Sequence, residues 1–138
     1  RALRDQLMVP ARDADGRLHT LQFISPDGGK RFLTGGRIAG CYYAIGRPDD
    51  ALLLAEGYAT AATLHQATGR AVAVCFNCGN LVAVARELRA KFPQLRFVIA
   101  ADNDVGTPGN PGLTAAHQAA KAIGARVAFP SFEGVAHV

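Results

Sequence analysis

Three acidic residues stand where apolar runs end, and their types and spacing could hold a divalent metal. Glu56 follows the apolar run Ala51–Ala55, and Asp102 and Asp104 follow the run at 97–101. Two Asp two residues apart point to the same side of an extended segment, where their like charges repel until a cation relieves the repulsion. Mg²⁺ or Mn²⁺ suits such a pair, because hard cations prefer oxygen ligands and share them with substrate phosphates. Glu56 could add a ligand or act as a general acid or base.

An alternation of strands and helices after residue 48 would bring these acids to one edge of a sheet. The apolar runs at 51–55, 71–76, 97–101 and 126–129 predict strands, and helices are expected at about 58–67, 81–92 and 113–123, the second capped by Asn80. Strands that are apolar throughout are typical of a parallel sheet flanked by helices. Ligands of such sheets bind beyond the carboxyl ends of the strands. We therefore expect an α/β fold with its site at that edge.

The first third of the chain predicts a small antiparallel meander. Asp15-Gly16 and Asp27-Gly28 separate short apolar runs. Asp-Gly between such runs is a strong hairpin signal, because glycine accepts the positive φ of tight turns. Strands are expected at 8–12, 18–24, 31–33 and 41–46. We therefore divide the chain into a β-rich subdomain at 1–47 and an α/β domain with a four-stranded parallel sheet at 48–138.

The excess of positive charge lies in that first third. The chain has a net charge of +4, and residues 1–47 contain eight Lys or Arg against four Asp, whereas the rest is neutral. A basic surface beside a neutral body fits a polyanionic partner such as nucleic acid. A solvated charged face explains the charge alone equally well. No apolar run reaches the roughly 20 residues that a membrane span needs, so no membrane association is expected.

Three motifs in order resemble the Toprim domain, the catalytic module of bacterial-type primases, of type IA and type II topoisomerases and of some nucleases. They are LLLAEGYATAATLHQATG, AVAVCFNCGNL and FVIAADNDVG, with an Ala-rich helix after the last. The resemblance covers roughly residues 51–130. The family has a Glu after the first strand and an Asp-x-Asp after the third, which match Glu56, Asp102 and Asp104. The resemblance implies that these three residues are catalytic and bind the metal.

The stretch GGKRFLTGG at 28–36 resembles the segment that precedes Toprim in bacterial replicative primases. It is still more similar to plasmid and phage primases, including the conjugative-transfer type and primase–helicase fusions. By this resemblance Lys30, Arg31 and Arg37 contact template phosphates or the incoming nucleotide. Lys and Arg are suited to such contacts, because these residues supply most nucleic-acid affinity by neutralising phosphates. A solvated hairpin with basic tips is the simpler alternative.

Together these resemblances imply the catalytic core of a DNA primase that depends on Mg²⁺ or Mn²⁺. It would make RNA primers for plasmid or phage replication or for conjugation, in the cytoplasm. Its partners would be a single-stranded DNA template and NTPs, with a replicative helicase domain or protein as a further partner. Because the chain begins with Arg1 rather than Met, we expect a piece of a longer protein with weak or no synthesis of its own.

Two other interpretations of the same residues stay open. The acids could serve another Toprim enzyme, a nuclease or a topoisomerase, and the latter would need a nucleophile such as Tyr42, Tyr43 or Tyr58. The chain could instead be a non-catalytic module that binds nucleotide or DNA. Nicking of supercoiled DNA with a divalent metal would favour the enzyme alternative.

The cysteines favour no cofactor of their own. Cys75 and Cys78 form a single CxxC pair. Structural zinc usually takes four ligands, so no structural zinc is expected. The odd number of cysteines, three, argues against a secreted disulfide scaffold and favours a reducing cytoplasm.

Overall fold

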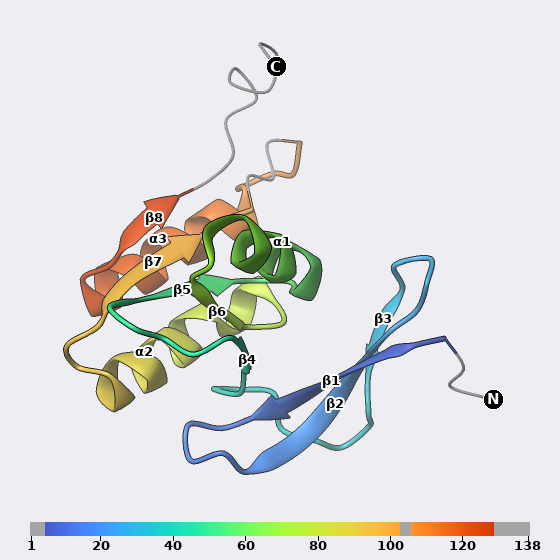
Figure 1. Cartoon of the computed structure of the whole chain (residues 1–138). Coiled ribbons are helices and arrows are strands. Elements are labelled where there is room, and N and C mark those ends of the chain that lie inside the picture. Colours follow the sequence, from blue (N-terminus) through green and yellow to red (C-terminus); the bar gives the residue numbers. More distant parts are fainter. Residues whose placement is uncertain (1–4, 103–105, 129–138) are drawn as a thin grey trace.

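The computed structural model describes residues 5–102 and 106–128 of the chain. Its elements, in chain order, are β1 (Leu7–Arg12), β2 (Leu18–Ile24), β3 (Lys30–Phe32), β4 (Tyr43–Ile45), β5 (Ala51–Ala55), α1 (Tyr58–Thr68), β6 (Ala71–Val74), the 3₁₀ turn η1 (Cys78–Asn80), α2 (Leu81–Lys91), β7 (Arg96–Ala100), α3 (Pro111–Ile123) and β8 (Arg126–Ala128). Within these residues the strands form two sheets, which lie beside each other in Figure 1. None of the described helices is long and apolar enough to cross a membrane.

The larger sheet confirms the predicted α/β fold. Among the described residues its strand order is β4-β6-β5-β7-β8, and β6, β5, β7 and β8 run parallel. The smaller sheet is the antiparallel meander β1-β2-β3. The strand expected at 41–46 forms as β4, which pairs antiparallel with β6. Tyr42, directly before β4, also forms an antiparallel bridge with Arg12 of the meander. Tyr43 and Ile45 pack there against the buried cluster that contains Val72 and Val74 of β6 and Val9 of β1. The division at residue 47 stays a prediction.

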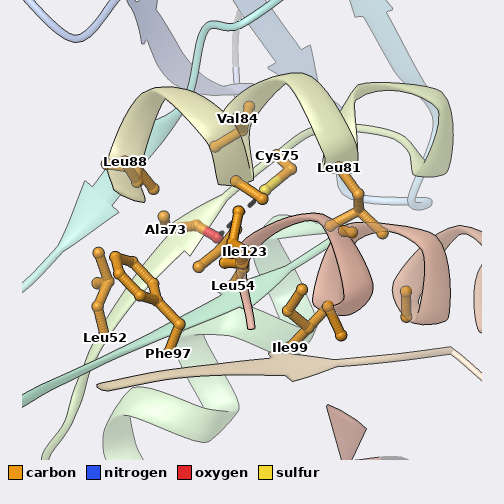
Figure 2. Packing of buried hydrophobic residues seen from close by; sticks show 14 of the residues in the cluster. Leu52, Leu54, Ala73, Cys75, Leu81, Val84, Leu88, Phe97, Ile99 and Ile123 are labelled. Carbon is orange, nitrogen blue, oxygen red and sulfur yellow. Dashed lines mark hydrogen bonds between the residues drawn. The ribbon is translucent and has the colours of Figure 1, made fainter. Parts of the chain in front are cut away.

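Apolar side chains alternate between the two faces of the larger sheet and so create two cores. On one face Leu52 and Leu54 of β5, with Phe97 and Ile99 of β7, meet buried residues of α2 and α3 (Figure 2). Leu88 of α2 is only 1% exposed in this cluster. The other face carries a separate cluster that includes a residue of α1. Helices therefore cover both faces of the larger sheet.

That second cluster attaches the small sheet to the large one. Val9 and Ala11 of β1 are buried with Val72 and Val74 of β6 and with Ala61 of α1. The Phe32 ring of β3 packs edge-on against Phe76, just beyond β6, with 5.5 Å between ring centroids. The small sheet thus lies against the carboxyl end of β6.

Candidate metal and nucleotide site

Glu56 and Asp102 stand at the carboxyl ends of two adjoining parallel strands. In the β5–β7 pair Ala55 lies opposite Ala100. Glu56 is the next residue after β5, and Asp102 is the second residue after β7. Both side chains are half-buried. The structure therefore brings these two predicted acids to the same edge.

Asp104, the third acid predicted for this edge, lies outside the described residues. Among the residues that are described, no three His, Cys, Asp or Glu side chains come together in a group that could hold a metal. The described part of the site is thus two carboxylates.

Backbone hydrogen bonds extend the ladders past the strand ends and hold this edge in place. The Cys75 N–H donates to the Ala55 carbonyl at 2.8 Å, directly before Glu56. The Ala101 N–H donates to the Ala128 carbonyl at 2.7 Å, directly before Asp102. Each acid therefore follows a residue whose position is fixed by a neighbouring strand.

The negative charge of Glu56 affects the pKa of Cys75, the residue that directly follows β6. Burial first, and the negative charge of Glu56 second, raise the pKa of the Cys75 thiol. Cys75 is completely buried in the core, where its Sγ contacts the Ala73 carbonyl (Figure 2). Because the thiolate is the form that binds metal, a buried thiol with a raised pKa is a poor ligand, and the candidate metal donors at this edge are the carboxylates.

Lys30 reaches this edge from the other sheet. A Cβ built on Gly57 would lie 3.5 Å from Lys30 Nζ, so the ammonium lies beside the residue that follows Glu56. Lys30 and Phe32 share one face of β3 because side chains alternate along a strand. The Phe32–Phe76 contact directs that face toward the larger sheet.

The other two predicted basic residues lie elsewhere. Arg31 is on the opposite face of β3, with its guanidinium 4.8 Å from the centroid of the Phe23 ring. Arg37 follows β3, and its Nη2 is 3.8 Å from Asp13 Oδ2 at the β1–β2 turn. Of the three residues, Lys30 lies beside the residue that follows Glu56, whereas Arg31 and Arg37 contact Phe23 and Asp13.

The carboxylate of Asp13, which the sequence did not single out, lies near Arg37 and has several other partners. His19 Nε2 lies 2.7 Å from Asp13 Oδ2, and the backbone N–H groups of Asp15 and Arg17 donate to Asp13 Oδ1. The bond with His19, followed by that with the Arg17 N–H, lowers the pKa of Asp13 to about 2. The Asp-x-Asp-Gly spacing is a turn signal and gave no hint of the histidine partner.

Asn80 stands directly before α2, but its side chain does not cap the helix as predicted. It makes no side-chain cap hydrogen bond, and its amide is buried among backbone groups of the segment before β4. The sequence contains no signal for this, because those groups are about 40 residues away along the chain.

The chain matches a known protein family over more than half of its length. The model of a family described as Toprim domain matches residues 51–133. The chain belongs to the Toprim family. Two relatives from Escherichia coli, both named DNA primase TraC, are 47% and 44% identical to this Toprim chain over 133 residues. The alignments cover 90% of the chain but only 12% and 9% of those relatives, so the chain spans about a tenth of their length.

Solved primase structures share the fold. The primase fragment of the bacteriophage T7 primase-helicase protein matches with a TM-score of 0.64 at 14% identity, over 90% of this chain and 52% of that one. The DnaG catalytic core matches with a TM-score of 0.58 at 17% identity, over 91% of this chain and 44% of that one. A DnaG primase catalytic domain bound to ssDNA also gives 0.58, at 18% identity and with the same coverage. The predicted resemblance to the Toprim domains of primases is confirmed.

Proposed function

We propose that this Toprim domain belongs to the catalytic core of a DNA primase that makes RNA primers on a single-stranded DNA template. The observation that carries the proposal is that three charged residues lie at one edge of the larger sheet. Glu56 and Asp102 follow adjoining parallel strands, and Lys30 comes to the same edge from a different sheet. The relatives named DNA primase and the DnaG structure bound to ssDNA support this assignment. We further propose that the primers serve plasmid or phage replication or conjugation.

The donors at this edge fit Mg²⁺ or Mn²⁺. Glu56 and Asp102 offer carboxylate oxygens, and we add Asp104 to them on the strength of the family pattern. When bound, the metal would stabilise the charge on the phosphates of an NTP and orient the 3′-hydroxyl of the growing primer. We further propose that Glu56 accepts the proton of that hydroxyl, as a general base.

Lys30 supplies the positive charge of the site. Its ammonium beside Gly57 is a compact point charge with three donors, suited to the phosphates of a nucleotide near the acids. Lys30 and Arg31 also line a hollow of about 240 Å³ together with Gln6, Ser25 and Gly29. We assign Lys30 to the nucleotide, and Arg31 and Arg37 to phosphates of the template that passes along the small sheet.

The tyrosines do not favour the topoisomerase alternative. Tyr43 and Tyr58 pack their rings against each other, with centroids 6.3 Å apart. Burial raises the pKa of Tyr42, which makes its phenolate harder to form. All three tyrosines are half-buried, and these contacts give them a packing role that needs no nucleophilic chemistry.

Template-directed ribonucleotide incorporation by the full-length protein tests the proposal. Asp102→Ala should lower incorporation by about a hundredfold or more, the scale seen when one stabilising group of a transition state is removed. Asp15→Ala is the matched control, because Asp15 is an exposed aspartate on the β1–β2 turn. Synthesis that survives Asp102→Ala undiminished would remove Asp102 from the mechanism, and an inactive wild type would contradict the proposed function.

A further inference from the structure

The segment that connects β3 to β4 (residues 33–42) is the covalent link between the two sheets (Figure 1). Asn80, from the start of α2, is buried against this segment and is 5% exposed. A buried amide needs hydrogen-bond partners to offset the loss of water. Its side chain bonds to backbone groups of the described residues, and most of these groups belong to the connecting segment.

The Asn80 amide fits these partners at both ends. Its Nδ2 lies within hydrogen-bond distance of three carbonyls, those of Ile38 at 3.1 Å, Cys41 at 3.0 Å and Cys75 at 2.9 Å, so one of its two hydrogens is shared between two of them. Its Oδ1 accepts from the Gly40 N–H at 2.8 Å. A carboxylate would place oxygen against three carbonyl oxygens, and an apolar side chain would leave buried carbonyls without donors. An amide of this length therefore has partners at both its oxygen and its nitrogen.

Asn80 joins the two parts of the molecule that carry the site. On one side, Cys75 accepts from Asn80 and donates its own N–H to the Ala55 carbonyl, directly before Glu56. On the other side, the connecting segment begins at Leu33, whose carbonyl accepts from Thr20 Oγ1 of β2 at 3.1 Å. Leu33 directly follows β3, the strand that carries Lys30.

We propose that Asn80 is a positioning residue, which holds the small sheet against the larger one so that Lys30 stays beside Gly57, the residue that follows Glu56. The effect of Asn80 on catalysis rests on the proposed function, because it assumes that Lys30 binds substrate phosphate. The effect of Asn80 on the placement of the two sheets does not depend on that function.

Asn80→Asp tests the geometric part, because it keeps the shape of the side chain and replaces the donor end. Spin labels on Leu33→Cys and Thr60→Cys, both exposed, report the distance between α1 and the residue that directly follows β3 of the small sheet. Cys78→Ser prevents labelling at the half-exposed cysteine, whereas Cys41 and Cys75 are buried. We expect a broader distance distribution and amide exchange of Gly40 that is at least about tenfold faster.

The matched control is Asn77→Asp, which makes the same change three residues earlier, at an exposed position of the same loop. It should leave both measurements unchanged. If Asn80→Asp does not fold, Asn80→Ser takes its place, because serine keeps one donor. Unchanged distances and exchange in the Asn80 variant would overturn the proposal. So would the complete unfolding of both variants, because Asn80 would then be needed for folding as a whole.

A double-mutant cycle tests whether Asn80 acts through Lys30. Lys30→Ala and Asn80→Ser should each weaken nucleotide binding by about tenfold, and the double variant should be no weaker than Lys30→Ala. A roughly hundredfold loss in the double variant would mean independent effects and would contradict the proposal. A wild type that binds no nucleotide would instead contradict the proposed function, and the distance and exchange measurements would still decide the role of Asn80.

Discussion

The two edges of the larger sheet both carry acidic side chains, but their cations come from different places. At the amino edge, Asp50 directly before β5 pairs with Arg70 directly before β6 and lies 3.9 Å from Arg96 at the start of β7. These are neighbouring strands, so sheet register alone brings the three residues together. At the carboxyl edge, Lys30 arrives from a different sheet to lie beside the residue after Glu56.

We interpret the amino edge as structural and the carboxyl edge as the proposed functional one. The amino-edge pairs are exposed, with 67% of the Asp50 side chain accessible, and such pairs typically contribute about 0–1 kcal/mol. At the carboxyl edge the acids are half-buried, and their cation depends on how two sheets pack. Removing a charge at each edge should therefore change different properties of the protein.

The largest expected effect is on catalysis at the carboxyl edge. Glu56→Gln should lower primer synthesis by the full-length protein by about a hundredfold, because it removes a metal ligand and a candidate base. Asp50→Asn, which neutralises an acid at the other edge, should leave the rate within about twofold. Steady-state incorporation on a single-stranded template measures both. Equal losses in the two variants would end the functional distinction between the edges.

The next effect concerns the two cations. Lys30→Ala should weaken nucleotide binding by about tenfold, since hydrogen bonds to a charged group are worth roughly 1.5–3 kcal/mol. Arg96→Ala, which removes a cation from the amino edge, should leave affinity unchanged. Titration at several salt concentrations adds a second criterion, because a variant without the Lys30 ammonium neutralises less phosphate charge and its binding should depend less on salt. Identical affinities in Lys30→Ala and the parent would exclude Lys30 from the site.

A smaller effect is expected on stability. Asp50→Asn should lower the free energy of unfolding by no more than about 1 kcal/mol, and less at high salt, because its ion pairs are solvated. Urea denaturation in low and high salt measures this change. A loss of several kcal/mol would show that the amino edge holds the sheet together, and the contrast between the edges would then need another basis.

The smallest effect concerns a third acid, Asp13, in the small sheet. The pKa of Asp13 in the folded protein, about 2, lies below its ordinary value of 3.8. Its contribution to stability is therefore present above about pH 4 and is lost as the pH falls from there toward 2. Asp13→Asn should show a shallower loss of stability over that range, in denaturation curves collected between pH 5 and pH 2. If stability falls with pH equally in the variant and the parent, the lowered pKa of Asp13 is contradicted.

The sequence predicted the elements well where local pattern decides them. Apolar runs marked β5, β6 and β7, and the Asp-Gly dipeptides marked the turns of the meander. Glu56 and Asp102 could be placed at one edge because strand ends of a parallel sheet coincide. The comparison with known proteins confirms the fold that this pattern predicted.

Packing between the sheets could not be predicted in the same way. β4 is three residues long, and nothing in so short a run specifies which sheet it joins. The partners of Asn80 are distant in sequence, so its local position before α2 indicated a cap instead. Lys30, Arg31 and Arg37 looked equivalent as basic residues of one stretch, and only tertiary structure separates Lys30 from the other two.

Binding of Mn²⁺ tests the central claim, that the carboxyl edge holds a divalent metal, most directly. The free ion can be followed by electron paramagnetic resonance as the full-length protein is titrated with nucleotide present. Glu56→Gln and Asp102→Asn should each weaken binding by about tenfold or more, as expected when a carboxylate ligand is removed from a hard-cation site, and Asp50→Asn should bind like the parent. Parent-like binding in both carboxyl-edge variants would contradict the account.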